Sequence, residues 1–235
     1  MPGCPGSPKL PPSDSDRKAP AIPDDDVFDA TPYLPERRSL SALRSAAACC
    51  RGCPLHEHAT QTVFGEGPCP ARLMLVGEVP GDQEDRAGRV FVGPAGRELD
   101  RALQSVGIAR DDAYVTNAVK HFKFEERGKR RIHQKPSRWE VRACNPWLRA
   151  ELDLVRPEAL VVLGATAGQA LLGPGFKVGE ARGRPIDNDL AELVTATAHP
   201  SAILRARDED ARNTMRAALA ADLRVVAEFL SAVRN

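Results

Sequence analysis

The sequence predicts an α/β protein, a three-layer α/β/α sandwich around a central, mainly parallel four-stranded sheet. Apolar segments of strand length, such as "ARLMLVG" and "EALVVLG", alternate along the chain with longer segments whose apolar residues recur at helical spacing. Strands that alternate with helices are typical of parallel sheets, because each crossover helix covers one face of the sheet.

The expected strands are the segments at residues 71–77, 113–119, 158–164 and 192–200. The expected helices are those at residues 39–53, 93–107, 136–155, 165–173 and 209–230. The first of these is short and runs into a Cys-rich turn. In the second, Leu99, Leu103 and Val106 share one face after a Pro-Ala-Gly start. In the third, Pro146 predicts a kink.

Composition separates a tail from one domain. Residues 1–38 are rich in Pro, Ser and Asp and lack apolar periodicity, so we expect a disordered tail before a single domain at residues 39–235. No apolar run is long enough to span a bilayer, and no basic-then-apolar leader begins the chain, so a cytoplasmic location is expected. Cysteines in that compartment are expected to be thiols or metal ligands.

Basic residues gather in one part of a nearly neutral chain. The net charge is +1, yet the segment from Lys120 to Arg138 is rich in Lys and Arg and holds only Glu125 and Glu126 as acids. Such a strip is typical of a surface that follows phosphates. The alternative is a loop that charge merely keeps soluble.

Ligands of parallel sheets bind at the carboxyl ends of the strands. Those ends read "GEVPGDQED", "NAVKHFKF", "GATAG" and "HPSAILR". The first is not a dinucleotide fingerprint, because it lacks G-x-G-x-x-G and its carboxylates, Glu78, Asp82 and Glu84, would repel a pyrophosphate.

Together the strand ends resemble the uracil-DNA glycosylase superfamily. "GEVPGDQEDRAGRVFVGPAG" at residues 77–96 is similar to its first motif, "HPSAILR" to its second, and "VTNAVKHF" to the segment with a base-reading asparagine. The iron–sulfur family 4 is the nearest group, and within it "GKRRIHQKPS" and His121 are similar to the UdgX type. Val79 departs from that type, which usually has glutamine there, so any contact from this position would come from its backbone.

The resemblance implies roles for the strand-end residues. Phe91 would stack on a flipped base, Asn117 would read uracil through its amide, and His199 would donate a hydrogen bond to uracil O2 as charge develops. Ser201 and Arg205 would hold a nearby phosphate. The alternatives are a core phenylalanine, a turn asparagine, a structural His-Pro and a surface arginine.

The resemblance to the UdgX type implies that His133 attacks C1′ of the sugar after uracil leaves, so that the protein becomes covalently joined to DNA. Glu78 would accept a hydrogen bond from His133 and orient it. Alternatively, His133 only contacts phosphate. The remaining contacts with the flipped nucleotide are expected from Gly77, Val79, Gly81 and Asp82. Contacts with the DNA backbone are expected from Lys129, Arg130 and Arg131.

Cysteines suggest a metal centre. Cys50-x-x-Cys53 begins a ligand set and Cys144 follows far downstream. Where family 4 members generally have a fourth cysteine this chain has His121, and the resemblance implies a 4Fe–4S cluster held by three Cys and one His. The same residue types also suit structural zinc.

The function expected from these motifs is uracil excision from DNA, followed by a covalent adduct between His133 and the abasic sugar. We expect uracil-containing DNA as the partner, single-stranded in preference, with no membrane and with the chain acting as a monomer. Two alternatives stay open: a conventional glycosylase that uses water, and a non-catalytic metal-containing module that binds nucleic acid.

Overall fold

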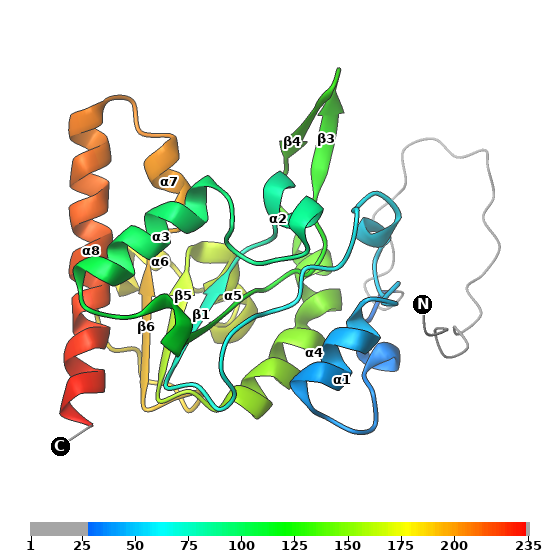
Figure 1. Ribbon diagram of the computed structural model, residues 1–235, viewed down its shortest axis with the longest axis horizontal. Helices are drawn as coiled ribbons and strands as arrows, with labels where there is room; N and C mark the ends of the chain where they lie inside the picture. The colour runs from blue at the N-terminus through cyan, green and yellow to red at the C-terminus, as the bar shows by residue number, and fades with distance from the viewer. Residues whose placement is uncertain (1–27, 234–235) are drawn as a thin grey trace.

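A four-stranded parallel sheet forms the centre of the protein (Figure 1). The computed structural model describes residues 28–233. The strands lie in the order β2 (Ala113–Asn117), β1 (Leu73–Gly77), β5 (Ala159–Leu163) and β6 (Leu193–Thr197), and every adjacent pair is parallel. All residues of these strands are buried, as expected where helices cover both faces of a sheet. The predicted fold class is confirmed.

Alternate strand residues enter two separate cores. Leu73 and Leu75 of β1 pack with α3 (Pro94–Ser105), α7 (Ser201–Leu204) and α8 (Glu209–Ala232). Met74 and Val76 pack on the opposite face, with α4 (Arg138–Val155) and α5 (Ala165–Leu172). The period of two in a strand thus divides one apolar run between two helical layers.

The helix boundaries follow from capping residues. Ser137 and Glu140 form a capping box at the start of α4, which then continues through Pro146. The Asp208 side chain caps α8 by accepting from the Ala211 amide at 2.7 Å. Within residues 28–233 no helix combines the length and the apolar character needed to cross a bilayer.

The domain begins earlier than the sequence predicted. Phe28 stacks on Trp139 with 5.1 Å between ring centroids, and the Ala30 amide donates to the Ala143 carbonyl at 2.9 Å. This segment, the short helix η1 (Thr31–Tyr33) and α1 (Leu40–Ala47) cover the outer side of α4. The expected tail boundary at residue 38 therefore shifts toward the N-terminus, and residues 1–27, with Cys4, lie outside the described part. The other short elements are η2 (Pro54–Glu57), α2 (Asp82–Ala87), η3 (Arg110–Asp112) and α6 (Val178–Ala181).

A β-hairpin stands where the sequence predicted a basic loop. Strands β3 (Phe124–Arg127) and β4 (Arg130–His133) pair in antiparallel fashion and extend away from the central sheet (Figure 1). Gly128 begins the two-residue turn between them with φ 61°, a left-handed conformation that glycine adopts without strain.

Candidate active site

Residues from the carboxyl ends of the strands converge, as the sequence predicted for a parallel sheet. Gly77 ends β1, and a Cβ atom placed on it would lie 2.3 Å from Asn117 Oδ1 and 2.5 Å from Cζ of Phe91. A Cβ on Gly164, which follows β5, would lie 3.0 Å from Cβ of His199. The two glycines therefore make room for the side chains of neighbouring strands to approach one another.

Phe91 occupies an unusual backbone conformation at this edge. Its φ is 54°, a left-handed value that costs a non-glycine residue roughly 1–2 kcal/mol. A Cβ on Gly96 would lie 1.7 Å from the Phe91 carbonyl oxygen, so only glycine at position 96 permits this backbone path. The Phe91 ring lies 6.0 Å from the His199 ring with 32° between their planes. The aromatic face predicted to stack on a base thus borders the histidine predicted to act on it.

Hydrogen bonds determine the tautomer of His199. Its Nδ1 accepts from the Ser201 amide at 3.2 Å and lies 2.8 Å from the Ser201 hydroxyl. Burial, together with the nearby His133 and Arg205, lowers the pKa of His199 to about 4. The ring is therefore neutral at pH 7, with its hydrogen on Nε2, and Nε2 is the atom that can donate to an oxygen in the site.

Ser201 and Arg205 form one unit with this histidine. Nη1 of Arg205 donates to the Ser201 hydroxyl at 3.1 Å, while the rest of the Arg205 side chain is exposed. Ser201, predicted to contact phosphate, thus makes its shortest contact with His199.

His133 reaches the same edge from the end of β4. His133 remains exposed to solvent, and its electrostatic neighbours are Glu78, Glu84 and Arg205. Partial desolvation of the ring, together with Arg205, outweighs the two carboxylates and lowers the pKa of His133 from its ordinary value. Oε1 of Glu78 is buried and has no hydrogen-bond partner. Glu78 and His133 therefore interact through charge, and the hydrogen bond expected between them is absent.

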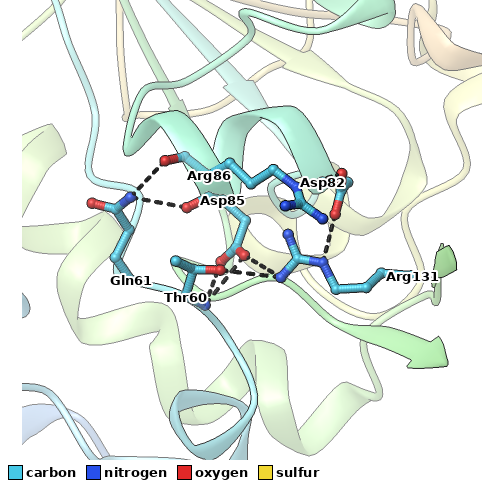
Figure 2. A network of polar contacts seen from close by, with 6 residues as sticks. All are labelled: Thr60, Gln61, Asp82, Asp85, Arg86 and Arg131. Atoms are coloured by element: carbon cyan, nitrogen blue, oxygen red, sulfur yellow. Dashed lines mark hydrogen bonds and ion pairs between the residues drawn. The ribbon is translucent and has the colours of Figure 1, made fainter. Parts of the chain in front are cut away.

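Arg131 anchors the hairpin to α2 (Figure 2). Its Nε donates to Asp82 at 2.5 Å, and its Nη1 donates to Asp85 at 2.7 Å and to the Thr60 hydroxyl at 3.1 Å. The guanidinium also lies 4.9 Å from the Phe124 ring centroid, a cation–π distance. Because its charge is taken by two carboxylates, Arg131 is placed to hold the hairpin, which differs from the phosphate contact expected of it.

The contacts of Arg131 also help to fix the position of His133. Arg131 and His133 alternate along β4, so their side chains leave the strand on the same face. Phe122 lies beside both, with its ring centroid 5.2 Å from the guanidinium and 6.1 Å from the His133 ring. Neither Asp85 nor Thr60 carried a sequence signal for this contact, because both lie far from residue 131 along the chain.

Several cations of the basic strip are neutralised by carboxylates of the protein itself. Lys120, Lys123, Arg127 and Arg131 all pair with carboxylates. The cations of this strip that remain exposed without an ion pair, within residues 28–233, are Lys129, Arg130, Lys135 and Arg138. Lys129 lies in the hairpin turn and Arg130 begins β4 directly after it, and both side chains are accessible to an anionic ligand.

The side chains of Asp82 and Val79, both expected to contact the flipped nucleotide, have partners within the protein. Asp82 begins α2 just after its N-cap Gly81, and hydrogen bonds from Arg86 and Arg131 lower its pKa. The Val79 side chain packs against the cluster that contains Cys50, Cys53 and Cys144, so only its backbone can face the site.

The three predicted cysteine ligands lie together in a buried cluster. Burial, followed by the proximity of Cys53, raises the pKa of the Cys144 thiol. Sγ of Cys144 accepts from the Lys120 amide, and Sγ of Cys50 accepts from Nε1 of Trp147, both at 3.3 Å. Such N–H···S contacts are typical of sulfur atoms that carry negative charge when bound to metal.

His121 borders the same region. It lines a cavity of about 200 Å³ together with Cys50 and His56. The Thr62 hydroxyl donates its hydrogen to the Ala47 carbonyl at 2.8 Å, so Nε2 of His121, 3.0 Å away, donates to Thr62. Burial lowers the pKa of His121 to about 4, so Nδ1 keeps a lone pair at pH 7. A donor on one ring nitrogen and a lone pair on the other suit a metal-binding histidine.

Cys50, Cys53, Cys144 and His121 are not arranged around the position of a single metal ion. Within residues 28–233, no group of three or more His, Cys, Asp or Glu side chains is arranged to hold a single metal ion. A cluster differs from a single ion in this respect, because each of its ligands binds a different iron and the ligands therefore stand further apart.

Comparison with known proteins agrees with the geometry at the sheet edge. Residues 64–224 match the family model described as the uracil DNA glycosylase superfamily, which covers most of the chain. The matched range includes the strands of the central sheet and the hairpin. The chain therefore belongs to the uracil-DNA glycosylase superfamily.

Curated relatives narrow the assignment to family 4. The chain is 39% identical over 164 residues to a type-4 uracil-DNA glycosylase of Thermotoga maritima, which covers 69% of this chain and 82% of that protein. It is 35% identical over 173 residues to a type-4 uracil-DNA glycosylase of Pyrobaculum aerophilum, covering 71% and 85%. A type-5 uracil-DNA glycosylase of the same organism is 33% identical over 174 residues.

Proposed function

We propose that this protein excises uracil from DNA and is then joined covalently to the abasic sugar through His133. The first part is supported by the type-4 relatives and by the strand-end residues. The second part rests on one observation: a histidine with a lowered pKa is carried to the strand ends by a hairpin that two carboxylates anchor. The names of the relatives do not distinguish covalent trapping from hydrolysis by water, so the covalent step is supported only by the position of His133.

Recognition of uracil is assigned to the residues around Gly77. A flipped base would lie against the Phe91 ring, and the Asn117 amide would offer a donor and an acceptor to its edge. Nε2–H of His199 would donate to uracil O2, where negative charge builds as the glycosidic bond breaks. Lys129 and Arg130 would contact phosphates from the tip of the hairpin.

The covalent step begins when the C1′–N1 bond breaks and its electron pair leaves with uracil. The carboxylate of Glu78 stabilises the positive charge on the sugar through proximity. The unprotonated nitrogen of His133 then donates its lone pair to C1′, and the imidazolium that forms loses its N–H proton through solvent to the uracil anion. The product is neutral uracil and an alkylated imidazole, which is a poor leaving group.

A denaturing gel with single-stranded DNA that contains one uracil tests both parts. The expected result is a protein–DNA band that resists heat and detergent, together with free uracil. Release of uracil without a shifted band would support hydrolysis by water. Salt-sensitive binding without any release of uracil would support a non-catalytic module.

His133→Ser separates excision from trapping. The smaller side chain leaves room for water, so we expect the shifted band to disappear while uracil release continues and free abasic DNA accumulates. Arg127→Ser is the matched control, because Arg127 lies in the same hairpin, its side chain is 68% exposed and no contact with DNA is assigned to it. A variant at position 133 that still formed the shifted band would overturn the assignment of the nucleophile.

We also propose that Cys50, Cys53, Cys144 and His121 hold a 4Fe–4S cluster, which would cross-link α4 to the segment after β2 and to the turn after α1. The buried thiols, the N–H···S contacts and the free Nδ1 of His121 support this. Iron and labile sulfide in the purified protein would distinguish the cluster from zinc. If His121→Ala kept the wild-type content of iron and labile sulfide, His121 would not be a ligand of the cluster.

A further inference from the structure

Lys120 and Glu151 form an ion pair in the interior of the protein. Their side chains are 1% and 0% exposed. Besides Glu151, Nζ of Lys120 donates to the Thr116 hydroxyl and to the Asn117 carbonyl, each at 2.7 Å. An ammonium group has three hydrogens to donate, and here each has an acceptor.

Both carboxylate oxygens of Glu151 also have hydrogen-bond donors. Oε1 of Glu151 accepts from the Tyr114 hydroxyl at 2.8 Å and from the Gly65 amide at 3.1 Å, and the Thr116 hydroxyl lies 3.0 Å from both of its oxygens. A buried ion pair is a costly way to stabilise a fold, since an apolar pair of similar volume often performs as well. The contacts of this pair therefore suggest a role beyond stability.

The pair acts on the backbone of Asn117. This residue ends β2, and its carbonyl accepts from Lys120. On its other side, the next amide, that of Ala118, donates to the Gly77 carbonyl at 2.9 Å. The peptide unit that follows Asn117 is thus held at both ends, which limits the directions in which the amide side chain can point.

The same pair reaches the cysteine cluster. The backbone amide of Lys120 donates to Sγ of Cys144, and Glu151 lies about two turns beyond Cys144 on the same face of α4. Lys120 therefore contacts α4 at two points and β2 at two points. A shift of α4 would be transmitted to the carbonyl of Asn117.

We propose that Lys120, with Glu151 as its counterion, is a positioning residue that holds Asn117 in place to read uracil. This inference rests on the proposed function, because it assigns to Lys120 a part in the recognition step. Lys120 lies behind the strand end and contacts no substrate; its effect passes through the backbone of Asn117.

A double-mutant cycle tests the proposal. The perturbation is Lys120→Met with Glu151→Gln, which removes both charges and keeps an acceptor for Tyr114 and Gly65. We expect the single-turnover rate of uracil excision to fall about tenfold, as for the loss of one positioning hydrogen bond. In an Asn117→Ala background the same pair of substitutions should change the rate less than about twofold, because the group being positioned is absent.

The control variant is Tyr114→Phe, which removes another hydrogen bond to Glu151 without touching Asn117; it should excise uracil at the wild-type rate. Equal losses in both backgrounds would make the pair structural and overturn the proposal. A wild-type rate for Asn117→Ala alone would overturn it as well. Absence of excision by the wild-type protein would instead overturn the proposed function.

If the double variant does not fold, Thr116→Val takes its place in the cycle. This substitution removes one acceptor of Lys120 and preserves side-chain volume. We expect about a threefold loss of rate that disappears in the Asn117→Ala background. A loss of the same size in both backgrounds would overturn the proposal.

Discussion

Replacing Arg131 with Met should detach the hairpin from α2. The substitution keeps much of the packing against Phe124 and removes the ion pairs with Asp85, which is 0% exposed, and with Asp82, which is 38% exposed. Breaking a buried pair from one side costs about 3–5 kcal/mol. Asp85 keeps the Thr60 amide at 3.0 Å, so the lower value applies, and the exposed Asp82 contact adds less than about 1 kcal/mol.

We therefore expect the free energy of unfolding to fall by about 3 kcal/mol, which in a domain of this size lowers the melting temperature by roughly 6–12 °C. Thermal unfolding followed by circular dichroism measures this change. Because His133 shares the strand, adduct formation at a temperature where the variant is folded should fall by more than uracil release does. Arg127→Met is the matched control: Arg127 lies in the same hairpin with its side chain 68% exposed. Its surface pair with Glu125 contributes less than about 1 kcal/mol, so this variant should keep the wild-type melting temperature and adduct formation.

The anchoring role would be refuted by a variant at position 131 that melts with the wild-type protein and forms adduct at the wild-type rate. A loss of stability with unchanged adduct formation would limit Arg131 to a structural part. A weaker affinity for DNA, without either effect, would return it to the phosphate contact that the sequence predicted.

Two further predictions concern the strand ends. Burial lowers the pKa of His199 to about 4, so its ring stays neutral as pH falls through about 6.5, the ordinary histidine value. The rate of single-turnover uracil release should therefore stay constant through that pH and decline with a midpoint at about 4. The stability that the neutral ring contributes is present above the unfolded pKa and is lost as pH falls from there toward 4; a rate midpoint near 6.5 would contradict the assignment. Gly77→Ala places a methyl group 2.3 Å from Asn117 Oδ1, so excision should fall by about a hundredfold or more. Gly179→Ala, with nothing within 4 Å, should be neutral, and an equal effect of both substitutions would refute the steric reasoning.

Apolar patterning was sufficient to predict the central sheet. Within "ARLMLVG" and "EALVVLG", the stretches Leu73–Gly77 and Ala159–Leu163 are apolar throughout, and such runs are typical of strands that bury both faces in a parallel sheet covered by helices. Because parallel strands end at one edge, the residues after them were expected to meet, and Asn117, Phe91 and His199 do lie around Gly77 and Gly164.

Charge patterning was a weaker guide. Lys120 and Arg131 belong to the basic strip in the sequence, yet the fold brings a carboxylate from α4 to the first and two from α2 to the second. A sequence displays the sign of a charge and does not display the partner that neutralises it, because that partner is distant along the chain.

The hairpin was missed for a related reason. "FKFEERGKRRIHQ" has charged residues on both faces, so no period of two in hydrophobicity marks β3 and β4. Its stability comes from contacts outside the segment, above all those of Arg131 with Asp82 and Asp85.

The sequence by itself determined the sheet, its covering helices and the set of polar residues that follow the strands, because local periodicity and capping specify elements and parallel topology specifies where they end. Only the tertiary structure decided that His133 stands on an anchored hairpin, that His199 carries its hydrogen on Nε2, and that Lys120 faces inward to Asn117. The physical reason is that tautomers, ion pairs and buried charges depend on atoms that meet only when distant segments pack together.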